Sequence, residues 1–106
     1  MSLFGFVKAP DINQGVLDFR ASPGALLLDV RSAQEYREGH IPGSVNLPLR
    51  EINRIDELAS DKADPLFLYC LSGARSRQAE AVLQHMGYSN VRNLGGISAW
   101  HGGVEY

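Results

Sequence analysis

Two short, unbroken apolar runs constrain the fold of this chain more than any other feature of its sequence. They span residues 25–30 and 66–70, and each is followed by a segment with helical character. Runs of this length are typical of central strands that are buried on both faces of a parallel sheet. Strands that alternate with helices favour βαβ units. We therefore expect an α/β fold with a mostly parallel sheet.

The other expected elements follow the same alternation. The pattern of apolar and turn-forming residues predicts helices over residues 10–20, 33–38, 51–59, 76–86 and 97–101, and strands over residues 3–8, 25–30, 44–47, 66–70 and 91–94. The second of these helices has the clearest start, because Ser32 and Glu35 match a capping box. Gly95-Gly96 is expected to form a turn. The first strand is the weakest prediction because it is short and contains a glycine.

The size and charge of the chain limit what it can be. Its 106 residues, 44% hydrophobic and 21% charged, suit one domain over residues 1–106 with an ordinary core. The formal net charge of −2 gives no general attraction to nucleic acid or to an anionic membrane. No apolar run approaches the roughly 20 residues that span a bilayer, and the first residues do not resemble a signal peptide. We expect a cytoplasmic protein with neither nucleic acid nor membrane as a partner.

Cys70 is the only cysteine, so several classes of site are excluded. An internal disulfide, an internal two-thiol redox relay and a four-cysteine metal site all need more thiols. The three histidines lie far apart and have no metal-ligand spacing. We therefore expect no metal and no cofactor. A lone cysteine is either a small buried hydrophobic residue or a reactive thiol, and composition does not choose between them.

The most informative stretch reads Cys-Leu-Ser-Gly-Ala-Arg-Ser, from Cys70 to Ser76. It joins the buried strand to the following helix, at the carboxyl edge where parallel sheets bind ligands. A tight loop of small residues can turn successive backbone N–H groups inward as an anion-binding nest, and Gly73 eases that conformation. The helix adds its free N–H groups and the positive end of its dipole. The stretch therefore predicts an anion-binding loop with Cys70 at its base.

The same surroundings would activate the thiol. A nest and a helix N-terminus favour the thiolate, so they lower the thiol pKa below its ordinary value of about 8.5. Arg75 adds a positive charge and a fork of donors suited to an oxyanion. A core position for Cys70 and a solvated position for Arg75 are the plain alternatives. The coincidence of loop, arginine and helix favours an anionic nucleophile that attacks an anionic substrate.

Three motifs in this order resemble those of the rhodanese family, the thiosulfate sulfurtransferases and their single-domain relatives. They are Asp29-Val30-Arg31 with Glu35-Tyr36 and the stretch from Gly39 to Pro48, then Tyr69-Cys70 through Ser76, then Gly95-Gly96-Ile97-Ser98-Ala99-Trp100. The resemblance covers about residues 9–102. It implies a rhodanese-like α/β fold, with a five-stranded, mostly parallel sheet flanked by helices on both faces.

The resemblance also implies a reaction. Cys70 would take a sulfane sulfur from a small anionic donor such as thiosulfate, and the persulfide would pass it to cyanide, a thiol or a protein acceptor. The substrate-binding residues carried over are Leu71, Ser72, Gly73, Ala74 and Arg75, whose backbone would cradle the bound species.

Two other functions remain open from the sequence. One is a persulfide carrier or protein-docking module with little small-molecule turnover. The other is a phosphatase or arsenate reductase. Related phosphatases have five residues between cysteine and arginine, whereas this chain has four. The shorter loop favours a sulfur atom over a phosphoryl group.

Four further side chains or pairs, and a set of five arginines, have a structural interpretation that outweighs a functional one. Asp29 is expected to be a hydrogen-bonded carboxylate rather than a general acid, and Arg31 is expected to pair with Glu35. His40 is expected to brace a loop rather than to act as a base, and Trp100 to anchor the core. Arg50, Arg54, Arg75, Arg77 and Arg92 would form a basic collar if they converged, although solvation is the default for all but Arg75.

Overall fold

The computed structural model describes residues 9–106, which contain four parallel strands. They are β1 (Leu26–Asp29), β2 (Ser44–Asn46), β3 (Leu66–Cys70) and β4 (Val91–Gly96), in the order β2-β1-β3-β4. The two central strands are the apolar runs of the sequence, and β3 is buried along its whole length. The α/β prediction is confirmed. The fifth strand, expected over residues 3–8, lies outside the described residues.

Helices connect the strands and cover the sheet. They are α1 (Ile12–Arg20), α2 (Ala33–Arg37) and α3 (Ala74–His85), with two 3-10 helices, η1 (Leu49–Glu57) and η2 (Ile97–Ala99). Helix α2 has the predicted capping box: the Ser32 side chain accepts from the Glu35 N–H, and the Glu35 side chain accepts from the Ser32 N–H. Because this box satisfies N–H groups that a helix start leaves free, it fixes where α2 begins.

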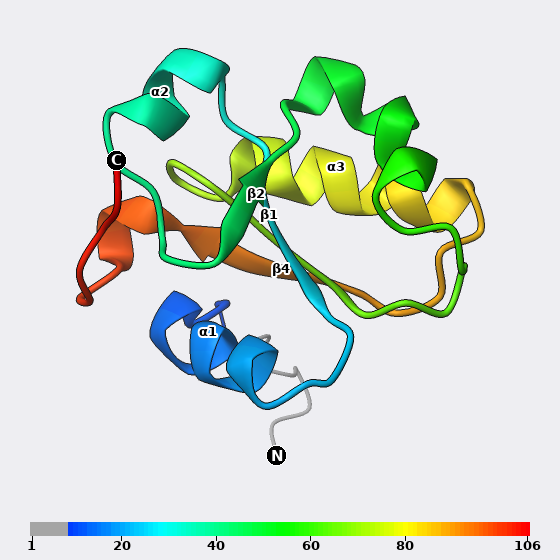
Figure 1. Ribbon diagram of the computed structural model, residues 1–106, viewed down its shortest axis with the longest axis horizontal. Coiled ribbons are helices and arrows are strands. Elements are labelled where there is room, and N and C mark those ends of the chain that lie inside the picture. The colour runs from blue at the N-terminus through cyan, green and yellow to red at the C-terminus, as the bar shows by residue number, and fades with distance from the viewer. Residues whose placement is uncertain (1–8) are drawn as a thin grey trace.

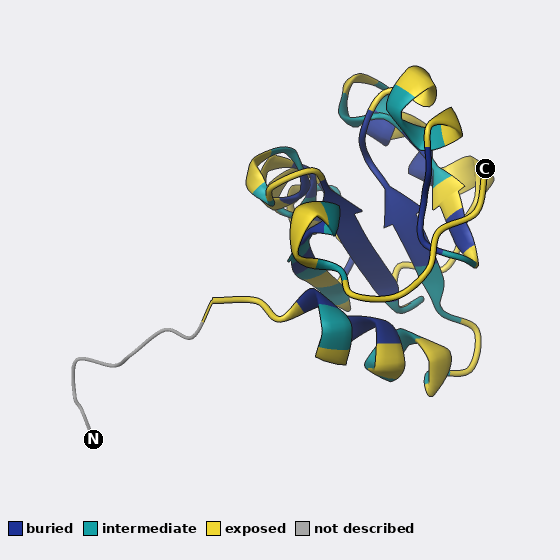
Figure 2. Ribbon diagram, turned by 90° about the vertical axis from the view of Figure 1, so that its left-hand side faces the viewer, coloured by how far each residue is buried: buried dark blue, intermediate teal, exposed yellow. Residues whose placement is uncertain are grey.

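The sheet separates two apolar cores (Figures 1 and 2). Helix α1 lies on one face, where Ile12 and Val16 pack with Leu27 and Tyr69. Helices α3 and η1 cover the other face, and their core includes Leu28, Val30, Ile55, Leu83 and Cys70. Neighbouring residues of β1 and β3 thus point to opposite faces, as the alternation of a strand requires. Figure 2 shows the buried strands between helices whose outer sides are exposed.

Two boundaries near the loop differ from the prediction. Helix α3 begins at Ala74, two residues before the expected start, because Gly73 at its N-cap has a φ of 104° that turns the chain directly into the helix. Gly95-Gly96 is the end of β4 rather than a turn. Gly96 is held in the strand by its pairing with Cys70, after a register shift in β3.

Candidate active site at the carboxyl end of β3

Cys70 is the last residue of β3, and its side chain has two contrasting surroundings. Only 1% of the residue is exposed. One side belongs to the apolar core that contains Val30 and Leu47. On the other side, Sγ accepts a hydrogen bond of 3.0 Å from the Gly73 N–H and lies 3.4 Å from the Ser76 hydroxyl. The sulfur is therefore shielded from water while its charged form still has donors.

These contacts set the acidity of the thiol. Burial raises the pKa of Cys70, and hydrogen bonds from the Ser76 side chain and from the N–H groups of Ser76, Gly73 and Ser72 lower it. The hydrogen bonds outweigh burial, so the pKa of Cys70 lies below its ordinary value. The arrangement favours the thiolate, which is the nucleophilic form of cysteine.

Ser76 is a part of the site that the sequence interpretation did not single out. It is fully buried in the first turn of α3. Its hydroxyl lies 2.7 Å from Oδ1 of Asn93 in β4, as well as 3.4 Å from Sγ of Cys70. The hydroxyl also lies 3.2 Å from the Gly73 carbonyl oxygen and 3.4 Å from that of Gly95, and because it has one proton to donate, these oxygens compete with the sulfur for it. Ser76 can therefore turn its proton to the sulfur when the sulfur becomes negative.

Strand β4 supports the loop from behind. A Cβ atom on Gly96 would lie 2.1 Å from the carbonyl oxygen of Leu71, so only glycine fits there without a shift of the loop. The Leu71 carbonyl also accepts from the Ser98 N–H at 3.1 Å. Gly73 also faces the backbone of Gly95, but a Cβ atom there would lie 3.4 Å away at ordinary contact distance, so its φ of 104° is what favours glycine. The closing glycine motif thus fixes the shape of the loop around Cys70.

Arg75 does not stand free beside this loop. Its Nη1 and Nη2 donate to the two carboxylate oxygens of Glu35 in α2, at 2.7 and 3.0 Å. The hydrogen bond from Arg75, with smaller contributions from Ser32, holds the pKa of Glu35 at about 2, although partial burial opposes this. The predicted Arg31–Glu35 pair is wrong, because Arg75 reaches Glu35 from a distant part of the chain while Arg31 turns inward.

Arg31 instead pairs with the fully buried Asp29, with Nη2 2.6 Å from Oδ2. Asp29 also accepts from the Arg31 N–H, and Arg31 donates to the Gly39 carbonyl at 2.7 Å. The interpretation of Asp29 as a carboxylate that fixes neighbouring loops is therefore confirmed. A buried ion pair of this kind is satisfied only while both partners are present.

The predicted roles of His40 and Trp100 are also confirmed. The His40 ring stacks on Tyr36 with centroids 3.6 Å apart, and its Nδ1 lies 2.8 Å from the Tyr36 carbonyl oxygen. His40 therefore braces the segment between α2 and β2. Trp100 packs on the core that α1 covers, and its indole N–H donates to the Gly103 carbonyl.

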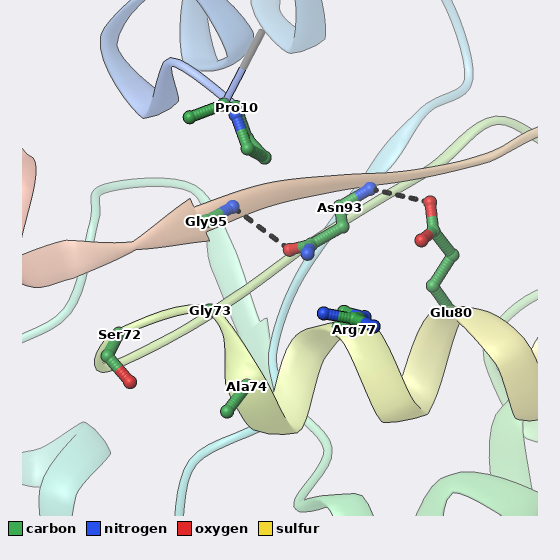
Figure 3. A pocket seen from close by; sticks show the side chains of 9 residues that line it. Pro10, Ser72, Gly73, Ala74, Arg77, Glu80, Asn93 and Gly95 are labelled. Carbon is green, nitrogen blue, oxygen red and sulfur yellow. Dashed lines mark hydrogen bonds between the residues drawn. The ribbon is translucent and has the colours of Figure 1, made fainter. Parts of the chain in front are cut away.

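Two cavities border the loop on different sides. A cavity of about 660 Å³ lies between α3 and β4 (Figure 3). The Asn93 N–H donates to Glu80 and so joins β4 to α3, while the Asn93 side chain accepts from the Gly95 N–H within β4. A second cavity, of about 270 Å³, is lined by Val30, Ser32, Pro48, Leu49, Arg50 and Arg75. Arg75, at the end of the stretch from Cys70 to Arg75, is the residue of that stretch that lines this smaller cavity.

The five arginines do not converge into a collar. Arg50 and Arg75 line the smaller cavity, whereas Arg77 lines the larger one. Arg54 forms ion pairs with Glu51 and Glu57, and Arg92 pairs with Asp18. The positive charge at the smaller cavity therefore comes from two residues, one of which is already paired.

The match to known proteins agrees with this geometry. A model of the rhodanese-like domain matches residues 13–102, which contain every element described above except the start of α1. The chain belongs to the rhodanese-like domain family. No helix of this rhodanese-like domain within residues 9–106 has the length and apolar character needed to cross a membrane.

Several relatives are sulfurtransferases by name. The chain is 41% identical over 71 residues to thiosulfate sulfurtransferase PspE of Escherichia coli, covering 66% of this chain and 68% of that protein. It is 46% identical over 77 residues to a sulfurtransferase of Allochromatium vinosum, covering 71% and 70%. The solved structure described as a rhodanese with anions from E. coli superposes with a TM-score of 0.69 at 37% identity, covering 73% of this chain and 92% of that one.

Proposed function

We propose that this rhodanese-like domain is a sulfurtransferase that carries a sulfane sulfur on Cys70. The main support is that Sγ of Cys70 is both buried and surrounded by hydrogen-bond donors. Cys70 is only 1% exposed, yet the Gly73 nitrogen lies 3.0 Å from Sγ and the Ser76 hydroxyl oxygen lies 3.4 Å from it. Donors fixed in place before the charge arrives stabilise an anion without reorganisation. The names of the relatives support thiosulfate as the donor.

The first half of the reaction loads the sulfur. The Cys70 thiolate attacks the sulfane sulfur of thiosulfate, and a new S–S bond forms. The S–S bond of thiosulfate breaks, and sulfite leaves with the electron pair. The product is a Cys70 persulfide whose outer sulfur bears the negative charge at neutral pH. The N–H groups at Gly73 and its neighbours are the groups proposed to stabilise that anion, together with the backbone of Leu71, Ala74 and Arg75.

The second half unloads it. Cyanide or an acceptor thiolate attacks the outer sulfur, the S–S bond to Cys70 breaks, and the Cys70 thiolate is regenerated. With cyanide the product is thiocyanate. Electrons and atoms balance over the two halves without an oxidant, and no metal ion or cofactor takes part in either step.

Replacement of the sulfur tests the proposal directly. Cys70→Ser is expected to abolish thiocyanate formation. The hydroxyl group of serine stays protonated at neutral pH, and without Sγ no persulfide can form. Intact-mass spectrometry of the wild type after thiosulfate treatment should show one added sulfur atom that cyanide removes. Ser89→Ala, at an exposed position near the amino end of β3 and thus at the opposite end of the strand from Cys70, is the matched control and should behave as the wild type.

Three results would contradict the proposal: thiocyanate formation by Cys70→Ser at the wild-type rate, a wild-type protein that gains no sulfur, and hydrolysis of a phenyl phosphate in place of sulfur transfer. The last would favour the phosphatase alternative.

A further inference from the structure

We propose that Arg50, rather than Arg75, supplies the uncompensated positive charge that binds the anionic group of the substrate. The ligand class is a small molecule with a sulfonate-like or carboxylate group, bound in the cavity of about 270 Å³ beside the Cys70 loop. This inference rests on the proposed sulfurtransferase function and names the residue that selects its substrate.

The charge of Arg75 is already balanced. Two of its donors are engaged by Glu35, at 2.7 and 3.0 Å, in a paired arrangement that matches the fork of the guanidinium. The pKa of Glu35 is about 2, so the carboxylate stays ionised wherever the protein is folded near neutral pH. The Arg75–Glu35 pair has no net charge, and a second anion approaching Arg75 would meet the negative charge of Glu35 as well.

Arg50 is in a different position. Within residues 9–106 no carboxylate lies within 4.0 Å of its guanidinium, so its charge is not compensated there. Its neighbour Glu51 is engaged with Arg54 at 2.9 Å and points its charge to that pair. The side chain of Arg50 is exposed at the cavity rim, where a ligand can reach it from solvent.

Backbone hydrogen bonds connect the start of η1, and so Arg50, to the strand that carries Cys70. The Leu49 N–H donates to the Val30 carbonyl at 3.0 Å, which ties the start of η1 to the segment that follows β1. The Val30 N–H in turn donates to the Tyr69 carbonyl at 3.0 Å, one residue before Cys70. Two hydrogen bonds therefore link the residue before Arg50 to the end of β3.

The lining of the cavity fits a ligand with two unlike ends. Val30, Pro48 and Leu49 give it apolar walls, and the two guanidinium groups lie among them. Low-dielectric walls strengthen the attraction between Arg50 and an anion compared with bulk water. Thiosulfate has this character, with three charged oxygens at one end and a polarisable sulfur at the other. An acceptor thiol that carries a carboxylate shares it.

Steady-state kinetics with a matched pair of arginine variants test the inference. Arg50→Ala is expected to raise the KM for thiosulfate about tenfold and to change kcat by less than about twofold, because a charge-assisted contact to the bound anion is lost while the sulfur chemistry remains. Arg50→Lys should recover part of the loss. Arg54→Ala, on the same 3-10 helix but paired with Glu51 and Glu57, should leave the KM unchanged. Equal effects of Arg50→Ala and Arg54→Ala, both on the KM for thiosulfate and on the KM for an acceptor thiol that carries a carboxylate, would overturn the inference.

The two halves of the reaction identify which molecule carries the anion. If Arg50 binds the donor, Arg50→Ala slows loading by thiosulfate, and unloading to 3-mercaptopropionate and to 2-mercaptoethanol is unchanged. If Arg50 binds the acceptor, only transfer to 3-mercaptopropionate is slowed, because 2-mercaptoethanol has no carboxylate. Unchanged rates in both halves would contradict any such role.

Failure of the proposed function gives a different pattern. A wild type that never forms thiocyanate defeats the sulfurtransferase proposal, but calorimetric titration of thiosulfate into the protein still tests the anion site. Binding that is lost in Arg50→Ala and kept in Arg54→Ala supports the site without the reaction. Equal binding of thiosulfate to both variants would contradict the proposed anion site as well.

Discussion

At the scale of single residues, the chemistry of Cys70 depends on a balance between burial and hydrogen bonding. Burial alone raises the pKa of the thiol, and the donors from Ser76 and the loop backbone reverse that effect. Ser76 has the largest share among the groups that lower the pKa. The same hydroxyl is shared with Asn93. The reactivity of Cys70 therefore depends on a buried serine in the first turn of α3.

Removal of the Ser76 hydroxyl should raise the pKa of Cys70. The folded thiol then keeps its proton to higher pH, because only the backbone N–H groups still offset the effect of burial. We expect the pH profile of Cys70 alkylation by iodoacetamide to move to higher pH in Ser76→Ala, with a rate at pH 7 about three- to tenfold below the wild type. Ser89→Ala controls for loss of an exposed hydroxyl. An unchanged profile in Ser76→Ala, with an unchanged melting curve, would contradict this account.

At the scale of elements, Glu35 joins two helices that carry the site. It closes the capping box of α2 and also receives the fork of Arg75 in α3. The side chains of Glu35 and Arg75 are 28% and 38% exposed, so solvent screens the pair and its net contribution is small. The pair orients α3 against α2 and so sets one wall of the smaller cavity.

The depressed pKa of Glu35 predicts a pH dependence of stability. A carboxylate whose pKa falls from 4.5 to about 2 on folding stabilises the fold above pH 4.5, and this contribution is lost as the pH falls toward 2. After discounting for exposure, we expect Glu35→Gln to lower the free energy of unfolding by about 1 kcal/mol at pH 7. Urea titrations across this range should show the difference from wild type closing between pH 5 and 2. Glu38→Gln, on the exposed side of α2, is the control; a gap that stays constant with pH would be inconsistent with the pair.

Local patterns predicted the elements that are decided locally. The apolar runs predicted β1 and β3 because both strands are buried on two faces, and the Ser32–Glu35 spacing predicted the start of α2. The prediction for the end of β4 was wrong because of a tertiary contact. Gly95-Gly96 has the composition of a turn, but Gly96 is glycine because the Leu71 carbonyl approaches it closely.

Side-chain pairing in the site shows the same limit. Helical spacing suggested Arg31 for Glu35, whereas the actual partner is 40 residues away. Arg31 instead forms an ion pair with the buried Asp29, and this pairing depends on burial rather than on helical spacing. The only sequence feature that could have pointed to Ser76 as a site residue is its position six residues after Cys70. No sequence feature pointed to Asn93. The catalytic role of Cys70 and the substrate-binding roles carried over for residues 71–75 stay predictions.

At the scale of the whole molecule, one sheet supports two cores, and Cys70 belongs to the one covered by α3 and η1. The other core contains Tyr69, whose hydroxyl accepts from the Ile41 N–H and lies 3.0 Å from the Ser44 hydroxyl. Adjacent residues of β3 thus serve opposite layers. A substitution that destabilises one core should therefore also destabilise the other, because the same strands contribute residues to both.

Truncation of Leu28 tests this coupling. Leu28 is fully buried in the core of Cys70, so Leu28→Ala should lower the free energy of unfolding by about 2–5 kcal/mol. Fluorescence of Trp100, the only tryptophan, reports on the opposite core, and its denaturation midpoint should move together with that of the far-UV circular dichroism. Leu17→Ala, at a residue 57% exposed, should change stability by less than about 0.5 kcal/mol. Separate midpoints would mean that the two cores unfold independently.

Gly96 restricts which parts of the site can accept substitutions. Any side chain there would meet the Leu71 carbonyl, so the wall formed by β4 offers no room for variation without moving the loop. The start of η1, which lines the smaller cavity, is partly exposed at Pro48 and Leu49 and exposed at Arg50. Remodelling of this domain for a new sulfur donor or acceptor, by natural drift or in the laboratory, should therefore concentrate on the residues around Pro48 and Leu49 and leave the glycine wall untouched.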